Sequence, residues 1–170
     1  HFQNKTSREK FKRSQIHIQK RSNGVHLFEM SANYKDVDED TIEMIQKLPI
    51  GCLYKVETDI SSCFPSVYSH ALPWALVGKE VAKSNRNDSI WYNQLDKCSR
   101  QTKYNETCGL LIGPHASNLL SEIVLTSVDY ELSDYNYMRY IDDITYYAKS
   151  EDEAELFIRK LSIELKKYEL

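Results

Sequence analysis

Two short aromatic and β-branched runs, separated by two adjacent aspartates, constrain the fold of this chain more than any other feature. The runs cover residues 137–141 and 144–148, and Asp142-Asp143 stands between them. Strand-like runs on either side of two turn residues predict an antiparallel β-hairpin. Because side chains alternate between faces along a strand, adjacent aspartates can act together only at such a turn. Aspartate is also common in turns for conformational reasons alone, so the pair can equally be structural.

The rest of the chain is typical of an α+β domain with helices packed on one face of an antiparallel sheet. A strand at 53–58 precedes several helical segments and the hairpin, and a last helix begins near Ser150, where Glu153 completes a capping-box pattern. We expect one helix at about 66–83, with an early turn or kink at Pro73, and a second at 90–101. A third helix should begin after Gly113-Pro114 and end at Leu132. The last helix should have an apolar face of Ala154, Phe157, Ile158, Leu161 and Leu165.

The first 50 residues carry weaker signals. Residues 16–18 and 25–28 can form a small hairpin around Asn23-Gly24, because Asn-Gly favours a two-residue turn. A short helix at 41–48, ended by Pro49, follows in this interpretation.

Composition narrows the class of protein. Residues 1–21 carry seven Lys or Arg against one acid, a net charge of +6 that leaves −9 for the remainder; this basic segment can be a solvated arm or can contact phosphates. The four cysteines lack zinc-ligand spacing, so we expect reduced thiols rather than a zinc site or a disulfide framework. No apolar run approaches the roughly 20 residues that span a membrane, which makes a cytoplasmic location the default expectation.

A third carboxylate, Asp59, changes the interpretation of the hairpin. It stands at the end of the strand at 53–58, which we expect to be core-like. Three acids held close together would raise one another's pKa unless a cation neutralised them. Magnesium prefers oxygen ligands, and a pair of Mg²⁺ ions can activate an attacking hydroxyl and stabilise a leaving group. The residues alone therefore predict a metal-dependent phosphoryl-transfer site.

Three motifs together resemble those of reverse transcriptases. Tyr140-Ile141-Asp142-Asp143 is similar to the Tyr-x-Asp-Asp signature of that family, and residues 59–64 are similar to its first palm motif, an Asp followed five positions later by an aromatic. Residues 109–117 resemble its second motif, a Gly-rich loop that enters a helix. A lone Tyr-x-Asp-Asp is a weak signal, whereas three motifs in the family's order are a specific one.

The resemblance implies a set of metal ligands. Asp59 and Asp142 would be the main ligands, the backbone carbonyl of Ile60 would add an oxygen, and Asp143 would be the supporting acid. These residues would hold two Mg²⁺ ions, with Mn²⁺ as an alternative.

The resemblance also implies contacts to nucleotide, template and primer. Phe64 would be a steric gate against the 2′-hydroxyl, although it can also be a core aromatic. Gly109, Gly113 and Ser117 would shape the loop near template and incoming nucleotide, although Gly, Pro and Ser also suit an ordinary helix start. Tyr140 would lie against the primer end, or would pack within the hairpin.

The resemblance further implies a right-hand polymerase palm with part of a fingers subdomain and no thumb. Residues 1–50 would be a partial fingers-like segment and 51–170 the palm, with a helical insertion at about 66–105. Two departures matter. Leu111-Ile112 replaces the usual Pro-Gln of the second motif, and no fingers motif with nucleotide-phosphate Arg or Lys can be aligned. Arg139 is either a surface charge or a backbone contact.

Residues 64–70, 73–76 and 112–114 are similar to prokaryotic reverse transcriptases of the abortive-infection and phage-defence type. This resemblance implies an RNA-directed DNA polymerase, a nucleotidyltransferase that joins dNTPs to a 3′-hydroxyl of a primer or to a protein hydroxyl, on an RNA or DNA template or without one, in antiphage defence. A homo-oligomer and no membrane partner are expected. The alternative is a catalytically inactive palm that binds nucleic acid or protein in a defence complex, and a metal nuclease or cyclase is a more remote hypothesis.

Overall fold

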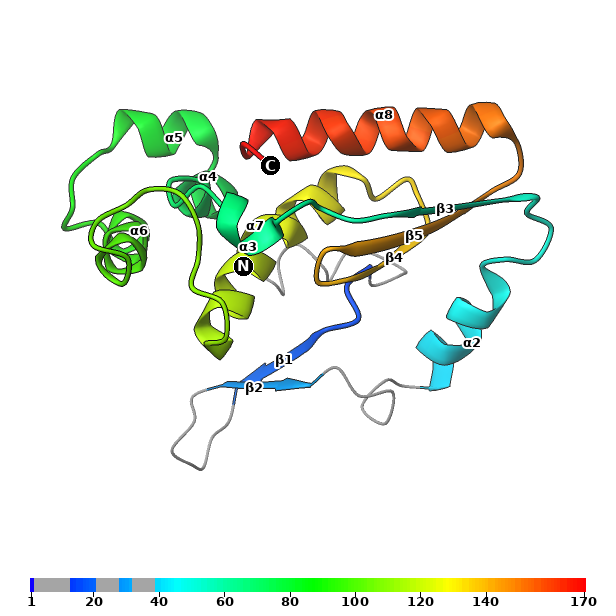
Figure 1. The fold of residues 1–170 in the computed structure, drawn as a ribbon, viewed down its shortest axis with the longest axis horizontal. Helices are drawn as coiled ribbons and strands as arrows, with labels where there is room; N and C mark the ends of the chain where they lie inside the picture. Colours follow the sequence, from blue (N-terminus) through cyan, green and yellow to red (C-terminus); the bar gives the residue numbers. More distant parts are fainter. Residues whose placement is uncertain (2–12, 21–27, 32–38) are drawn as a thin grey trace.

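The computed structural model of the chain describes residues 1, 13–20, 28–31 and 39–170 (Figure 1). The expected Asn23-Gly24 turn and most of the basic segment lie outside these residues. The fold has helices and a three-stranded antiparallel sheet, which agrees with the α+β expectation. In the described ranges, no helix has both the length and the apolar character needed to cross a membrane.

The main sheet has the strand order β3-β5-β4, with β3 at Tyr54–Thr58, β4 at Tyr137–Tyr140 and β5 at Asp143–Ala148. All three expected strands are therefore confirmed. β5 is central and pairs with β3 in a register that sets Thr58 opposite Ile144. The expectation of a core-like strand at 53–58 holds only in part, because β3 is an edge strand of this sheet and Val56 is its buried side chain.

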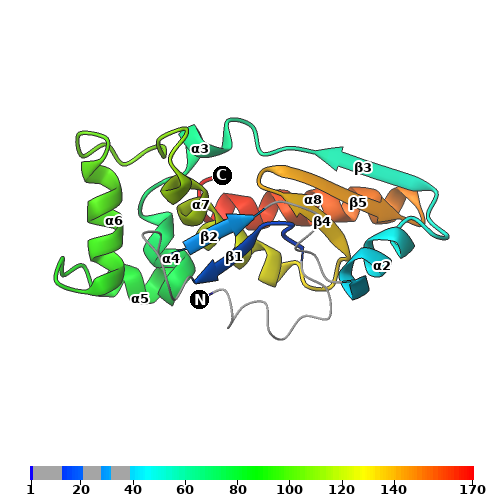
Figure 2. The ribbon, with the colours of Figure 1, turned by 90° about the horizontal axis from the view of Figure 1, so that it is seen from below.

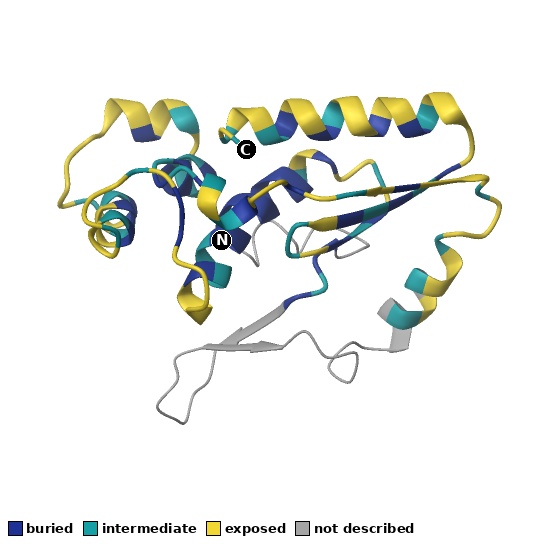
Figure 3. Cartoon of the chain, in the orientation of Figure 1, coloured by how far each residue is buried: buried dark blue, intermediate teal, exposed yellow. Residues whose placement is uncertain are grey.

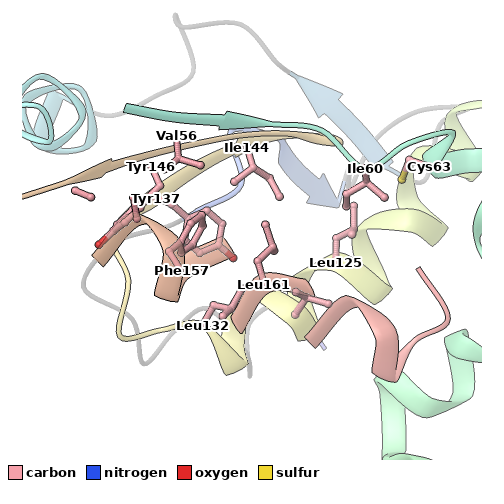
Figure 4. Packing of buried hydrophobic residues seen from close by; sticks show 13 residues of the cluster. Val56, Ile60, Cys63, Leu125, Leu132, Tyr137, Ile144, Tyr146, Phe157 and Leu161 are labelled. Carbon is pink, nitrogen blue, oxygen red and sulfur yellow. The ribbon is translucent and has the colours of Figure 1, made fainter. Parts of the chain in front are cut away.

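Two long helices cover one face of the sheet and enclose the main core. They are α7 at His115–Glu131 and α8 at Glu151–Lys167, whose buried sides face the sheet (Figures 1 and 3). Phe157 of α8 is fully buried, and its ring lies 5.3 Å from that of Tyr137 and 4.3 Å from that of Tyr146 (Figure 4). The removal of such apolar area from water is what fixes the helices on the sheet.

The start of α8 follows the capping pattern expected at Ser150 and Glu153. The Ser150 hydroxyl accepts a hydrogen bond from the Glu153 amide at 3.3 Å, and the Glu153 carboxylate accepts one from the Lys149 amide at 2.7 Å. The expected apolar face is correct except at Ile158, which is 48% exposed. A helix turn presents Leu161 and Phe157 to the sheet and leaves Ile158 at the margin.

A second, smaller core joins the short helices to α7. The single helix expected at about 66–83 is wrong, because most of that range is divided between two helices, α4 at Ala71–Val77 and α5 at Lys79–Ser84, and a further short helix, α3 at Cys63–Ser66, precedes them. The break lies at Gly78, whose φ of 92° is incompatible with a continuing helix, whereas Pro73 sits in the first turn of α4, where proline is tolerated. The helix expected at 90–101 is confirmed as α6, Trp91–Gln101.

The N-terminal part contributes a separate two-stranded sheet and one helix. Strands β1 (His17–Lys20) and β2 (Phe28–Ser31) pair antiparallel, so the expected pairing of two early strands is confirmed, but both begin later than the expected 16–18 and 25–28. Helix α2 runs over Glu39–Lys47, close to the expected 41–48. Figures 1 and 2 show the two-stranded sheet on the side of the main sheet that lies away from α8.

Candidate active site

The hairpin turn that carries the adjacent aspartates is shifted by one residue from the expected turn. Tyr140 pairs with Asp143, so Ile141 and Asp142 form the turn and Asp143 opens β5. Ile141 has a φ of 57°, a left-handed conformation in which a β-branched residue is an outlier. The two aspartates therefore stand in different backbone environments, one in the turn and one in the strand.

The end of β3 lies against this turn. The Ile60 amide donates a hydrogen bond to the carbonyl oxygen of Asp142 at 3.2 Å, two residues beyond the last strand residue, Thr58. Asp59, which precedes Ile60, is therefore next to the backbone of Asp142. Ile60 and Asp142, 82 positions apart in the chain, are joined in this way because β3 pairs with β5 along the whole of β3.

The charge of Asp142 affects the thiol of Cys63, which lies in the first motif. Burial raises the pKa of the Cys63 thiol to about 11, with further upward contributions from Asp142 and Glu122 that Arg139 partly opposes. Cys63 follows Asp59 by four positions, so its thiol lies in the electrostatic field of the turn. Asp59 and Asp143 are exposed and Asp142 is half-buried, so the carboxylates are open to solvent rather than sealed in the core.

The donor chemistry of this region fits a hard divalent cation, because the three aspartates and the Ile60 carbonyl offer only oxygen ligands. Within the described residues, however, no group of three or more His, Cys, Asp or Glu side chains is placed to hold one ion. The structure therefore joins the segments of Asp59 and Asp142 without gathering three carboxylates at a point.

The second-motif loop lies directly against the segment that carries Phe64. The Leu110 amide donates to the Phe64 carbonyl at 2.7 Å, and the Gly109 amide donates to the Val67 carbonyl at 2.8 Å. Gly109 has a φ of 87°, and a Cβ there would lie 3.0 Å from the carbonyl oxygen of Pro65. Glycine is therefore required at 109 by both conformation and space. Phe64 itself is half-buried in α3, so it is not a residue of the main core.

The remaining expected site residues differ in their accessibility. Gly113 has a φ of 111° with open space around it, and Tyr140 is 45% exposed. Ser117 is buried in the first turn of α7, where its amide donates to the Pro114 carbonyl at 3.0 Å. Leu111 and Ile112, at the positions of the missing Pro-Gln, are exposed by 41% and 79%.

The sequence left two alternatives open for Arg139. Its side chain is 1% exposed, so the surface-charge interpretation is wrong, and its Nη1 donates to the protein's own Ile141 carbonyl at 2.8 Å. Its two carboxylate partners, Glu122 and Asp129, were not predicted from the sequence; they accept hydrogen bonds from the guanidinium at 2.6 Å each. Burial opposes the charge, but Asp129 and Glu122 hold the pKa of Arg139 well above its ordinary value.

A sequence signal for these partners existed. Glu122 and Asp129 stand seven positions apart within the apolar stretch of α7, where two acids on one face need a cationic partner. Both are buried, and Asp129 also accepts a hydrogen bond from the Tyr137 hydroxyl at 2.6 Å. The buried ionic network of Arg139, Glu122 and Asp129 thus links α7 to β4.

The described end of the basic segment packs along β4. The Arg139 amide donates to the Arg13 carbonyl, and the Gln15 amide donates to the Arg139 carbonyl, both at 2.8 Å. The Arg13 guanidinium is buried and donates to the carbonyls of Ser133 at 2.6 Å and Tyr135 at 2.7 Å. At Arg13, therefore, the basic segment is neither a solvated arm nor a free phosphate contact.

A family model described as "Reverse transcriptase (RNA-dependent DNA polymerase)" matches residues 4–170. The chain therefore belongs to the reverse transcriptase family. It is also 26% identical over 146 residues to a protein named "Retron Ec83 reverse transcriptase" from Escherichia coli, a match that covers 82% of this chain and 46% of that relative. The chain spans about half the length of the curated relative it matches. The relationship to prokaryotic reverse transcriptases is thereby confirmed.

Proposed function

We propose that this chain is the catalytic part of a DNA polymerase that transfers deoxynucleotides to a 3′-hydroxyl, or to a protein hydroxyl. The observation that carries the proposal is the hydrogen bond from the Ile60 amide to the Asp142 carbonyl, which joins the segment of Asp59 to the hairpin turn. Family membership supports a nucleotidyltransferase that uses a nucleic-acid template and nucleotide substrates.

Asp59 and Asp142, assisted by Asp143 and the Ile60 carbonyl, would hold two Mg²⁺ ions, with Mn²⁺ as the alternative. When bound, these ions would supply activation of the attacking hydroxyl and neutralisation of charge on the leaving pyrophosphate. The carboxylates contribute negative charge and orientation, and their exposure leaves room for a triphosphate beside them. The side chains of Asp59 and Asp143 can adopt other rotamers because they are not packed in the core.

Phe64 would exclude a 2′-hydroxyl, and the loop of Gly109 and Gly113 would face the nucleotide and template. The hydrogen bond from Leu110 to the Phe64 carbonyl supports this pairing, since it ties the loop to the gate. Ser117 is buried, which favours a role in shaping the loop rather than in direct contact. Tyr140 is exposed beside Asp143, as a residue at the primer end needs to be.

A role in antiphage defence, with a cytoplasmic location, is the biological setting we propose. Its support is the similarity to a protein that is named a retron reverse transcriptase, together with the resemblance of residues 64–70, 73–76 and 112–114 to reverse transcriptases of the phage-defence type. We also propose that residues 1–50 are fingers-like, that 51–170 form the palm with a helical insertion at about 66–105, and that the chain self-associates.

A second candidate function is a non-catalytic palm that binds nucleic acid or protein. The observation that favours it is that the described side chains do not form a three-carboxylate cluster. The polymerase requires both nucleic-acid binding and synthesis, whereas the non-catalytic palm would bind nucleic acid or a protein without synthesis.

One experiment separates the two candidates. The full-length protein is incubated with each labelled deoxynucleotide, with Mg²⁺ or after its removal by chelator, with and without an RNA or DNA template. The products are resolved under denaturing conditions before and after protease treatment. Metal-dependent incorporation supports the polymerase, and a protease-sensitive product indicates a protein hydroxyl as primer. Binding of template without incorporation under any condition would establish the non-catalytic palm instead.

A further inference from the structure

The turn that carries Asp142 has a strained backbone. Ile141 lies in the left-handed region with a φ of 57°. Non-glycine residues in such conformations persist only when the surrounding structure holds them, and they occur preferentially at functional sites. A restraint on Ile141 is therefore part of what keeps Asp142 in place.

Arg139 supplies that restraint through the peptide group itself. Its Nη1 donates to the Ile141 carbonyl at 2.8 Å. This carbonyl belongs to the peptide that joins Ile141 to Asp142, so its direction determines the backbone from which the Asp142 side chain departs. The contact crosses the turn on the buried side, since Arg139 is 1% exposed, whereas Tyr140 and Asp143 lie on the solvent-exposed side.

The guanidinium is in turn fixed to α7. Nη1 and Nη2 face the Glu122 carboxylate at 2.6 and 3.1 Å, while Nε and Nη2 face the Asp129 carboxylate at 3.0 and 2.6 Å. A planar guanidinium with its donors in a rigid fork has one orientation that satisfies two such carboxylates. The turn is therefore held in position by α7 through Arg139, and not by the strand ends alone.

A contribution to folding stability is a weak explanation for the presence of this buried ionic network. Replacing a buried ion network by groups of similar volume without charge is often neutral or stabilising, because desolvation offsets the attraction between the charges. An apolar replacement of Arg139 would lack the donor that reaches the Ile141 carbonyl. The geometry that Arg139 imposes on the turn is thus the property that the charged network provides.

We propose that Arg139 is a positioning residue for Asp142: Glu122 and Asp129 fix its guanidinium, which holds the Ile141 carbonyl and so aims Asp142 at the end of β3. The catalytic consequence rests on the proposed function. The structural consequence does not, because it is read at the Ile60 amide, which donates to the Asp142 carbonyl only when the turn is in place.

Two variants of the full-length protein test this inference. Arg139→Lys keeps the charge but loses the fork, so it cannot serve both carboxylates and the turn. The triple variant Arg139→Met, Glu122→Gln, Asp129→Asn removes all three charges together and leaves amide acceptors for Ser14 and Tyr137, which bond to Glu122 and Asp129 in the wild type. Arg100→Lys is the matched control, because Arg100 pairs with Asp96 at 3.3 Å outside the site.

Two readouts separate positioning from general stability. We expect kcat to fall by about 100-fold in both variants, with KM for the deoxynucleotide little changed, since a small misplacement of a reacting group costs on that order. We also expect the Ile60 amide to exchange with solvent faster, while amides of α8 such as that of Phe157 keep their wild-type exchange rates. Arg100→Lys should change neither.

The inference is overturned if the folded triple variant retains wild-type kcat and wild-type exchange at Ile60, or if Arg139→Lys does so. It is also overturned if exchange rises equally at Ile60 and Phe157, because the role would then be stability of the whole fold. Should the wild type make no product at all, the proposed function fails, and the exchange at Ile60 still decides the positioning role.

Discussion

The Ile60 amide donates a hydrogen bond to the carbonyl oxygen of Asp142, and this contact holds the end of β3 against the turn between β4 and β5. Asp59 and Asp142 thereby belong to one local structure although they are far apart in the sequence.

The first prediction concerns Phe64. If its ring occupies the space that a 2′-hydroxyl needs, Phe64→Ala should increase the use of ribonucleotides relative to deoxynucleotides. The measurement is the ratio of kcat/KM for a ribonucleotide and the matching deoxynucleotide in the full-length protein. Trp91→Ala, which removes an exposed aromatic of α6, is the control. An unchanged sugar preference in Phe64→Ala would remove the gate role.

The second prediction concerns the close approach at Gly109. Gly109→Ala forces an L-residue into φ 87° and sets its Cβ 3.0 Å from the Pro65 carbonyl, so the loop must move. Gly51→Ala has a similar φ of 77° with open space, and it should lower the free energy of unfolding by about 1–2 kcal/mol for the backbone conformation alone. Urea denaturation should show a larger loss for Gly109→Ala. Equal losses would mean that the contact with Pro65 is unimportant.

The third prediction is a pH dependence of stability. The folded protein holds the pKa of Cys63 at about 11, above the ordinary value of 9.0, mainly through burial. Because the folded state binds this proton more tightly, the stability it contributes is complete below pH 9.0 and is lost as the pH rises towards about 11. The difference in unfolding free energy between wild type and Cys63→Ala should shrink over that range. A pH-independent difference would contradict the shift.

The same thiol reports on Asp142. Since the Asp142 carboxylate contributes to the raised pKa, Asp142→Asn should lower the pKa of Cys63. The pH at which Cys63 loses its contribution to the free energy of unfolding, measured against the matching Cys63→Ala variant, should then move to a lower value. Asp134→Asn, at a side chain that is 84% exposed, should leave it unchanged. A Cys63 pKa unaffected by Asp142→Asn would mean that the turn does not lie near the first motif.

The fourth prediction tests the core under the hairpin. Phe157 is fully buried against Tyr137 and Tyr146, so Phe157→Ala should lower the free energy of unfolding by about 3–5 kcal/mol. Its neighbour Leu156 is 57% exposed, and Leu156→Ala should have little effect. Similar losses for the two variants, measured by denaturant unfolding, would contradict the packing of α8 on the sheet.

The hairpin and its flanking strands could be predicted because their signal is local: two apolar runs and a short connection. The register of the turn could not. Ile141 occupies a turn position that its side chain disfavours, and the contact that holds it comes from Arg139, whose partners Glu122 and Asp129 lie on a helix that precedes the hairpin. A tertiary contact of this kind overrides local preference.

The helical region shows the same limit. Apolar spacing predicted helix over 66–83, but Gly78 divides α4 from α5, and the pattern alone does not tell a glycine tolerated in a helix from one that ends it. Ile158 fits the apolar face of α8 by spacing and is nevertheless 48% exposed, so the spacing alone does not show where the buried face ends.

For the candidate site, the motifs led to proposed residues but not to their geometry. The motifs point to Asp59, Asp142 and the loop around Gly109, and their roles stay predictions. How the segments are joined, by backbone hydrogen bonds from Ile60 and Leu110, depends on strand register and loop packing that no single motif contains.

The most direct test of the central claim, that Asp59 and Asp142 act as one unit in nucleotidyl transfer, is a double-mutant cycle on incorporation of labelled deoxynucleotide. Asp59→Asn, Asp142→Asn and the double variant are compared with wild type in the full-length protein, with Asp134→Asn as control. Residues that act together give strongly non-additive losses. We predict that each single variant loses nearly all Mg²⁺-dependent activity and that the double variant is no worse. Losses that multiply, or a single variant that keeps wild-type activity, would contradict the account.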